Sequence, residues 1–286
     1  MQMKSLINLI TKQAMSVVLL MVAMIFTAGF MFSCGGPSQT ADAAEEAKEG
    51  EAKEGPEFTA PVADNTLTEA EIADGWVLMF DGETSNGWRG YGKEKFPEAW
   101  EVVDGTIHMT GSGRGEAGSV EGGDIIYEKE FQNFHFQLEW KISEGGNSGI
   151  FYLGQETPDY DFIWKTAPEM QILDNEKHPD AKLGKDGNRK AGSLYDLIAA
   201  NPQNSNPANE WNQVEIIVYK GTVVHKQNGE TILEYHLWTP EWEELIAGSK
   251  FPELNENWAN VATKGYLGLQ DHGDDVWFRN LKIKEL

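Results

Sequence analysis

Alternation of apolar and polar side chains is the dominant pattern after residue 72. From Phe134 to Ile142 the apolar residues occupy the even positions and the polar residues occupy the odd positions. This period of two predicts a β-strand with one face in a core. Further strands are predicted where branched and aromatic residues gather between turn-forming residues, over 211–219, 222–226 and 231–235.

Turn-forming dipeptides divide such runs into hairpins. Asp104-Gly105 and Asn228-Gly229 each separate two short β-like runs. Both dipeptides favour two-residue hairpin turns, because Asn, Asp and Gly accept positive φ angles. Hairpins are therefore predicted for 100–109, for 222–235 and, around the polar segment 271–275, for 265–283.

One helix is predicted with both of its ends. Thr239 can cap the first turn, Pro240 suits that turn, and Gly248 suits the end. Thr68 followed by Glu71 predicts one further helical turn. Many short strands with one short helix favour an all-β fold, namely an antiparallel β-sandwich.

The first 33 residues have the pattern of a signal peptide. Lys4 and Lys12 precede an uncharged, largely apolar stretch over 13–36. Small residues beside Cys34 resemble a bacterial lipoprotein signal, although Met31 stands where Leu is usual. We expect cleavage before Cys34 and lipid on its thiol, which places the protein on the periplasmic side or the outer surface of the outer membrane.

Two other interpretations of this stretch stay open, an uncleaved membrane anchor and secretion without lipid. Cys34 is the only cysteine in the chain, so no disulfide can form within it. Residues 34–71 are predicted to be a flexible acidic tether, because large apolar groups are scarce there and ten acidic residues face two lysines over 35–71. Residues 72–286 are predicted to be one folded domain.

Charge and composition narrow the class of partner. The chain has 286 residues, 40% of them hydrophobic and 11% aromatic, which is enough for a sizeable core and excludes disorder throughout. Its formal net charge is −23, and residues 72–286 hold 19 basic against 36 acidic side chains. A folded surface of that charge repels phosphates, so we expect no nucleic-acid partner.

Strand alternation also predicts a polar face. Glu169 and Gln171 point away from the side of their strand that carries the apolar Met170 and Ile172, and Gln270 takes the same kind of position on a later strand. A sheet face with carboxylates, amides, aromatic rings and glycines is typical of a carbohydrate cleft. The alternative is that these are ordinary solvent-facing positions.

Two loops carry reactive side chains. The loop 174–192 gathers Asp174, His178, Lys185 and Arg189, and the segment 270–275 contains His272. Loops on a rigid sheet often carry catalytic residues. Motifs of serine hydrolases, zinc proteases and nucleotide-binding loops are absent from the sequence. No cofactor is required by the sequence, and the loop carboxylates leave a divalent metal such as Ca²⁺ open.

Several ordered motifs resemble those of the 3-keto-disaccharide hydrolase domain family, over about 75–286. They are Gly75–Gly82 with Gly87-Trp88, Asn147–Tyr152, Glu169–Asn175, His178–Asp180, Gly192–Leu197, Glu210–Asn212 and Gly265–Asn280. The resemblance implies a concanavalin A-like or laminin-G-like jelly roll that acts on glycosides oxidised at C3. The resemblance does not assign catalytic or binding roles to individual residues.

The chemistry of such a substrate defines what the site must contain. A ketone at C3 makes the C2 proton acidic, and its loss gives an enolate that can expel the group at C1. Addition of water to the resulting enone completes a net hydrolysis. The enzyme needs a base near C2, donors or positive charge near the C3 oxygen, and an acid at the glycosidic oxygen.

Candidates for these roles follow from residue type and position. His178 or His272 is predicted to be the base or acid, with Asp174 and Asp271 as orienting partners or metal ligands, and Glu169 as an alternative base if burial raises its pKa. Lys185 or Arg189 is predicted to hold the enolate oxygen. The predicted substrate-binding residues are Asn147, Gln171, Asn175, Lys185, Arg189, Tyr195, Gln270 and Arg279.

Two other functions compete with the cleavage of oxidised (3-keto) glycosides. One is a non-catalytic carbohydrate-binding module on a lipoprotein. The other is a conventional glycan hydrolase of the same sandwich fold, which needs paired acids on one strand. Gln171 and Leu173 occupy the positions where the second and third acids would stand beside Glu169, which disfavours that function. The predicted partners are thus an oxidised glycoside and, through the lipid on Cys34, a membrane; the sequence leaves protein partners unknown.

Overall fold

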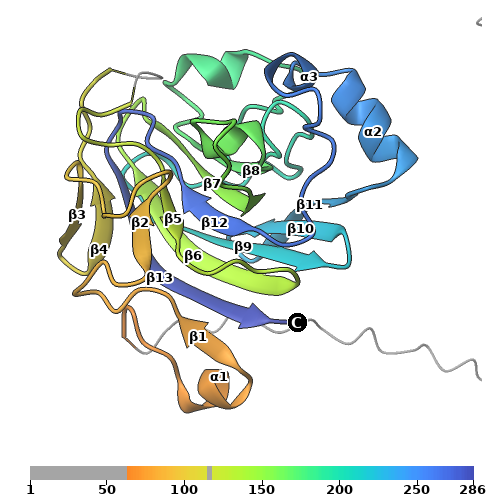
Figure 1. Cartoon of the computed structure of the whole chain (residues 1–286). Coiled ribbons are helices and arrows are strands. Elements are labelled where there is room, and N and C mark those ends of the chain that lie inside the picture. Colours follow the sequence, from red (N-terminus) through yellow and green to blue (C-terminus); the bar gives the residue numbers. More distant parts are fainter. Residues whose placement is uncertain (1–62, 115–117) are drawn as a thin grey trace, which may run out of the picture. The chain divides into compact units, whose positions relative to one another are not determined.

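The computed structural model describes residues 63–114 and 118–286, which form a sandwich of two antiparallel sheets (Figure 1). One sheet has eight strands in the order β11-β10-β9-β6-β13-β4-β3, with β1 also paired to β13. The other has five strands in the order β2-β5-β12-β7-β8. The predicted all-β sandwich is confirmed.

The larger sheet contains β1 (Trp76–Leu78), β3 (Trp100–Val103), β4 (Thr106–Met109), β6 (Phe134–Ile142), β9 (Asn212–Tyr219), β10 (Thr222–Gln227), β11 (Glu230–His236) and β13 (Val276–Glu285). The smaller sheet contains β2 (Trp88–Gly90), β5 (Ile125–Tyr127), β7 (Asn147–Gly154), β8 (Glu169–Leu173) and β12 (Tyr266–Leu269). The helices are α1 (Glu69–Ala73), α2 (Pro240–Ala247) and α3 (Phe251–Leu254), with the 3-10 turns η2 (Ile163–Lys165) and η3 (Pro179–Lys182).

Two of the three predicted hairpins are confirmed. β3 and β4 pair across Asp104-Gly105, where both φ angles are positive, at 49° and 72°. β10 and β11 pair across Asn228-Gly229, with φ angles of 48° and 83°. Only glycine and short polar residues adopt this left-handed region at low cost, which is why the dipeptides predicted the turns.

The third predicted hairpin is wrong. β12 pairs with β5 and β7 in the smaller sheet, whereas β13 pairs with β4 and β6 in the larger one. Residues 270–275 therefore cross from one sheet to the other. Both strands turn apolar side chains to the shared core, such as Leu267 and Phe278, so alternation alone could not separate the two arrangements.

The predicted helix ends are also confirmed. The Trp242 N–H donates to Thr239 Oγ1 at the start of α2, and Gly248 follows its end. Thr68 and Glu71 form a reciprocal capping box at the start of α1. Among the described residues, no helix is long and apolar enough to cross a membrane.

The folded domain begins before the predicted boundary at residue 72, which falls inside α1. Glu71 is buried against Lys282 of β13. The Asn65 N–H donates to Asn280 Oδ1, and the Asn280 N–H donates to Asn65 Oδ1. Residues 63–71 thus belong to the domain, while the predicted signal peptide and residues 34–62 of the predicted tether lie outside the described residues.

A large hydrophobic core fills the space between the sheets, with Trp140, Tyr152 and Phe278 among its largest members. A second, smaller cluster lies on the outer face of the five-stranded sheet, where Ile163 of η2 covers Phe151 and Ile126. β7 is therefore buried on both faces along its whole length. This second layer leaves part of the outer sheet face open, and the candidate site lies there.

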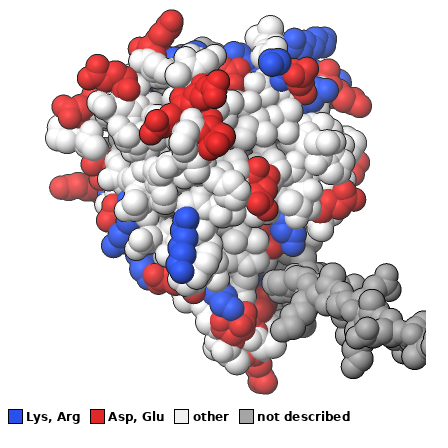
Figure 2. Space-filling model, turned by 90° about the vertical axis from the view of Figure 1, so that its right-hand side faces the viewer, with Lys and Arg blue, Asp and Glu red and all other residues white. Residues whose placement is uncertain are grey.

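Acidic and basic side chains are interspersed on the face of the domain drawn in Figure 2. Acidic groups are the more numerous over the whole chain, 46 against 23. The view shows no broad basic patch of the kind that binds nucleic acid.

Candidate functional site

A cleft of about 670 Å³ opens over the outer face of the five-stranded sheet. Its floor comes from the ends of β5, β7, β8 and β12, and one wall comes from η2 and α3. Among the predicted residues, it brings together Asn147, Glu169, Gln171, Tyr195, Gln270, Asp271 and His272. For Glu169 and Gln171 this agrees with the alternation argument, because their strand neighbours Met170 and Ile172 belong to the core.

Glu169 is the most unusual group in the cleft. Its side chain is buried, and burial raises its pKa to about 8. None of the described residues donates a hydrogen bond to its carboxylate. Gly149 on β7 makes room for it, since a Cβ there would lie 2.2 Å from Glu169 Oε1. The sheet thus holds a carboxyl group that is mostly protonated at neutral pH and free to meet a ligand.

Asp124, directly before β5, is a second buried carboxyl in the cleft. Burial and the nearby charge of Asp271 raise its pKa to about 7, although it accepts a hydrogen bond from the Asp271 N–H at 3.1 Å. Asp271 itself accepts backbone N–H groups from Ser119, Gly123 and Gly273. Asp271 therefore has a structural role that ties the crossing segment to residues 118–123.

The end of the cleft near Asn147 is polar and incompletely satisfied. The Asn147 amide contacts His272 Nε2 at 3.2 Å, while Asn147 Oδ1 and Gln270 Oε1 are buried without a hydrogen-bond partner among the described residues. His272 Nδ1 is also buried and makes no hydrogen bond, although Asp274 Oδ2 lies 3.8 Å from it. Gln171 Oε1 accepts the Ile172 N–H, which leaves its NH₂ group to face the cleft. Buried polar atoms normally find partners, so these groups indicate a hydroxyl-rich ligand at this end.

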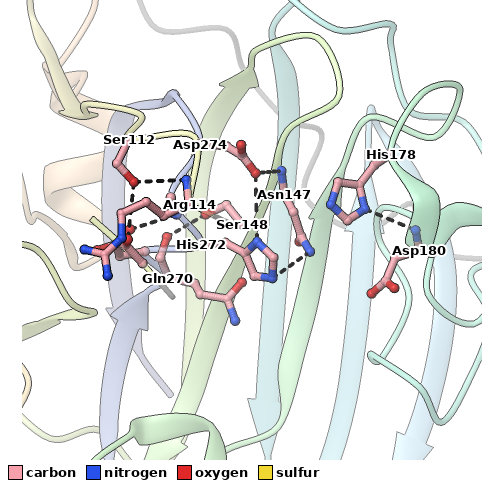
Figure 3. Close-up of polar contacts among 12 residues, drawn as sticks. Ser112, Arg114, Asn147, Ser148, His178, Asp180, Gln270, His272 and Asp274 are labelled. Carbon is pink, nitrogen blue, oxygen red and sulfur yellow. Dashed lines mark hydrogen bonds and ion pairs between the residues drawn. The ribbon is translucent and has the colours of Figure 1, made fainter. Parts of the chain in front are cut away.

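His178 and His272 lie next to each other, with ring centroids 6.0 Å apart (Figure 3). Together with Asp274 they offer three ligand atoms within 4.8 Å of one another, a set that could hold a metal ion. His178 Nδ1, however, accepts the Asp180 N–H at 3.2 Å, which places the ring proton of the neutral histidine on Nε2. Burial lowers the pKa of His178 and favours that neutral form. A metal would have to displace this proton, so the arrangement fits hydrogen bonding better than metal binding.

The opposite wall of the cleft is apolar. We call it the aromatic wall, and it consists of Phe162, Trp164, Phe251, Leu254 and Trp258. The rings of Phe162 and Trp164 stack at 5.5 Å, and those of Phe251 and Trp258 stack at 4.1 Å. Stacked rings of this kind bind flat apolar surfaces.

The cations of the cleft are not the predicted ones. Lys250 and Lys93 line it, and the Lys250 ammonium lies over the Tyr195 ring at 4.5 Å. Lys185 is exposed and outside the lining. Arg189 donates to Asp196 at 2.5 Å, and its guanidinium lies 5.5 Å from the centre of the Tyr195 ring, so it supports a cleft residue without lining the cleft.

Three more predicted residues lie outside the cleft lining, where they form hydrogen bonds or ion pairs within the fold. Asp174 accepts N–H groups from Gly145 and Glu176, and Asn175 bonds Ser205 and the Ala191 N–H. Arg279 on the larger sheet pairs with Glu139 at 2.8 Å in a separate cavity. Nothing in these contacts assigns the three a role in binding, and their predicted roles stay predictions.

Several cleft residues escaped the sequence argument, among them Asp124, Trp164, Lys250 and Trp258. Asp124 carried a signal, since a lone carboxylate directly precedes the apolar Ile125-Ile126. The others lie on segments whose placement over the sheet depends on tertiary contacts, such as the bond from Trp258 Nε1 to the Trp164 carbonyl.

Comparisons with known proteins agree on one family. The model of the family described as a 3-keto-alpha-glucoside-1,2-lyase-like domain matches residues 75–284. A 3-keto-disaccharide hydrolase of Bacteroides thetaiotaomicron is 48% identical over 93% of this chain and 97% of its own length.

Two solved structures of candidate glycosyl hydrolases from Parabacteroides distasonis resemble the fold. One is 31% identical with a TM-score of 0.69, over 78% of this chain and all of the other. The second is 28% identical with a TM-score of 0.53, over 70% of this chain and all of the other.

Proposed function

The chain belongs to the 3-keto-alpha-glucoside-1,2-lyase-like domain family, and on that premise we propose that it is an enzyme that cleaves 3-keto-glycosides, including 3-keto-disaccharides, by net hydrolysis. The proposal rests on family membership together with a cleft that holds a protonated carboxyl group beside unpartnered amides and a histidine.

Glu169 carries the proposal. A carboxyl with a pKa of about 8 is mostly protonated at pH 7, so it can donate a proton to the glycosidic oxygen as the C1–O bond breaks. It stands opposite Phe151 in the β7–β8 register, between the polar end of the cleft and the aromatic wall. That is where the bond between a sugar and its leaving group would lie.

His272 is the proposed base for the C2 proton. Its ring lines the cleft, and its Nε2, which the Asn147 amide contacts at 3.2 Å, is the nitrogen that can accept a proton. Its Nδ1 lies 3.8 Å from the Asp274 carboxylate, which favours the protonated ring. The NH₂ groups of Gln171 and Gln270 can donate to the C3 oxygen as negative charge develops there. Lys250 adds positive charge to the same cleft.

The proposed reaction steps balance with water as the only co-reactant. The C2 proton passes to His272, the C1–O bond breaks, and the leaving oxygen takes the Glu169 proton. Water then adds to C1 of the enone while its proton returns to Glu169. His272 returns its proton to C2, and the net change is hydrolysis.

A conventional glycosidase mechanism fits this cleft less well. It needs one carboxylate ionised as nucleophile or base while the other stays protonated. Here burial raises the pKa of two buried carboxyls of the cleft, Asp124 to about 7 and Glu169 to about 8. Among the described residues, no cation bonds to either and holds it in the ionised form.

Hydrogen exchange separates the two proposed roles. The full chain is incubated with 3-keto-trehalose in D₂O, and sugar release and deuterium at C2 are both measured. Glu169→Gln should keep C2 exchange and lose release, whereas His272→Ala should lose both. Exchange that survives in His272→Ala would reject the histidine as the base, and release from unoxidised trehalose at the same rate would reject the keto mechanism.

We also propose that the protein is an exported lipoprotein held on a membrane through Cys34. The support is the sequence pattern of residues 1–36, with two lysines, an uncharged apolar stretch and the only cysteine. Residues 34–62 would then separate the enzyme from the lipid surface.

A further inference from the structure

The cleft changes character along β7. Near Asn147 and Gly149 it carries the amides and His272, and Gly149 lies opposite Gln171 in the register. Toward η2 it becomes apolar, because Phe162, Trp164 and Ala167 line it there. Glu169 stands between the two halves.

The aromatic wall is held rigid by contacts between its two segments. Trp258 Nε1 donates to the Trp164 carbonyl at 3.1 Å, and Asn255 Nδ2 donates to the Lys165 carbonyl at 2.9 Å. In Figure 1, α3 lies above β8, the strand that carries Glu169. The wall is therefore fixed beside the proposed acid before any ligand arrives, which lowers the entropy cost of binding.

Part of the wall is uncovered. The side chains of Phe162 and Leu254 are 48% and 37% exposed, and both line the cleft. Single exposed apolar residues are ordinary, but these two line one cleft together with the Trp164 ring, which stacks on Phe162. A ligand that covered this surface would release its water.

The polar groups behind the aromatic wall already have hydrogen-bond partners within the protein. The Trp258 indole N–H bonds the Trp164 carbonyl, and the Tyr160 hydroxyl donates to Asn255 Oδ1 at 2.8 Å. A second sugar placed here could reach the Lys250 ammonium, which lies 5.7 Å from the centre of the Phe251 ring, but its other hydroxyl groups would meet the apolar wall, which is costly. An aromatic ring has no such requirement.

We propose that the aromatic wall is the leaving-group subsite and that it favours aryl leaving groups over a second sugar. The assignment of the other half of the cleft to the oxidised ring rests on the proposed function. The wall then determines which 3-keto-glycosides are cleaved fastest, while the polar end recognises the sugar common to all of them.

Kinetics of matched substrates test the subsite. The wild type, Phe162→Ala and Trp164→Leu are assayed with the 4-nitrophenyl and methyl glycosides of 3-keto-glucose and with 3-keto-trehalose. Each variant is compared with the wild type on the same substrate, so that differences in leaving-group reactivity cancel. Tyr219→Ala is the control, because Tyr219 is an exposed aromatic residue outside the cleft.

We expect kcat/KM to fall about tenfold or more on the aryl substrate and less than about twofold on the methyl substrate, from the loss of ring stacking. The fall in kcat/KM on 3-keto-trehalose should lie between these two values. Equal losses on the aryl and methyl substrates would overturn the subsite, and a larger loss on the trehalose substrate would overturn the aryl preference.

A binding measurement keeps this test separate from the proposed activity. Calorimetry with unoxidised phenyl glucoside and methyl glucoside needs no turnover. If the wild type released nothing from any 3-keto-glycoside, the proposed function would fail while the subsite could still be measured. Phenyl glucoside should bind the wild type more tightly than Phe162→Ala by several fold, and equal binding would reject the wall as a subsite.

Discussion

At the scale of single residues, burial controls the chemistry of the cleft. Asp124 and Glu169 are removed from water, and no cation in the described part of the chain bonds to either, so each resists ionisation and the charge of Asp124 discourages that of Glu169. A raised carboxyl pKa suits proton donation near neutral pH. It also costs stability whenever the group must ionise inside the fold.

Glu169→Gln should therefore separate activity from stability. We expect kcat to fall about 100-fold or more, because an amide cannot donate the proton. Wild-type activity should decline as the pH rises through about 8, where Glu169 loses its proton. Kinetics from pH 5 to 10 measure both.

The same substitution has a predicted sign for stability. The folded pKa of Glu169 is raised above its ordinary value of 4.5, so its protonated form supports the fold below that pH, and this support is lost as the pH rises toward 8. Glu169→Gln should thus have a higher melting temperature than the wild type at pH 9 and a similar one at pH 4. The exposed Glu176→Gln serves as the control, and a pH-independent difference would contradict the argument.

At the scale of elements, the pairing of β7 with β8 makes the space for the acid. Gly149 and Gln171 are direct cross-strand partners, and Glu169 reaches across to lie over the glycine. The segment 270–275 then brings His272 to the same place by crossing between the sheets. The site thus depends on one glycine and one crossover.

Gly149→Ala tests this packing. The new Cβ would lie 2.2 Å from Glu169 Oε1, so the carboxyl must move. We expect kcat to fall at least about tenfold, with a stability loss of about 1–3 kcal/mol from overpacking. Gly248→Ala is the control, because its Cβ would meet only ordinary contacts at 3.6 Å. Unchanged kcat in Gly149→Ala would show that the position of the carboxyl is not critical.

At the scale of the whole domain, the segment 63–74 packs against β13 of the larger sheet, at the end of the domain away from the cleft. α1 and β1 lie at the bottom of Figure 1, whereas α3 lies at the top. The contact between Glu71 and Lys282 joins α1 to β13, and both side chains are buried. This contact between α1 and β13 contributes to the stability of the domain, and neither side chain lines the cleft.

Glu71→Ala should destabilise the domain by about 3 kcal/mol, because it removes a buried partner of the Lys282 ammonium. KM and kcat should stay within about twofold at 25 °C. Glu71→Gln, which keeps one oxygen acceptor, should lose less. Chemical unfolding of the full chain gives the free energies, and a change in KM without a change in stability would contradict a purely structural role.

The proposed attachment to a membrane predicts a change of compartment. Cys34→Ala should move the expressed protein from the membrane fraction to the soluble fraction and abolish incorporation of labelled fatty acid. Ser33→Ala is the control, since it keeps the thiol. Unchanged partition of Cys34→Ala would reject lipid attachment at this residue.

The sequence by itself determined the features that depend on local backbone geometry, namely strand faces, hairpin turns and a helix start. Period-two alternation places Glu169 and Gln171 on the face opposite Met170 and Ile172, and the turn dipeptides and Thr239 mark hairpins and a helix start where the structure has them. These signals work because backbone dihedral preferences and the two-fold pleat act over a few residues.

Only the tertiary structure decided which segments meet. Alternation says which side of its own strand a residue takes, but it is silent about which sheet that strand joins, so β12 and β13 could be mistaken for a hairpin. For the same reason Lys250 and Trp258 fold over the cleft while Lys185 and Arg279 lie outside it. Long-range packing places these loops, and packing depends on the shapes of surfaces that are distant in sequence.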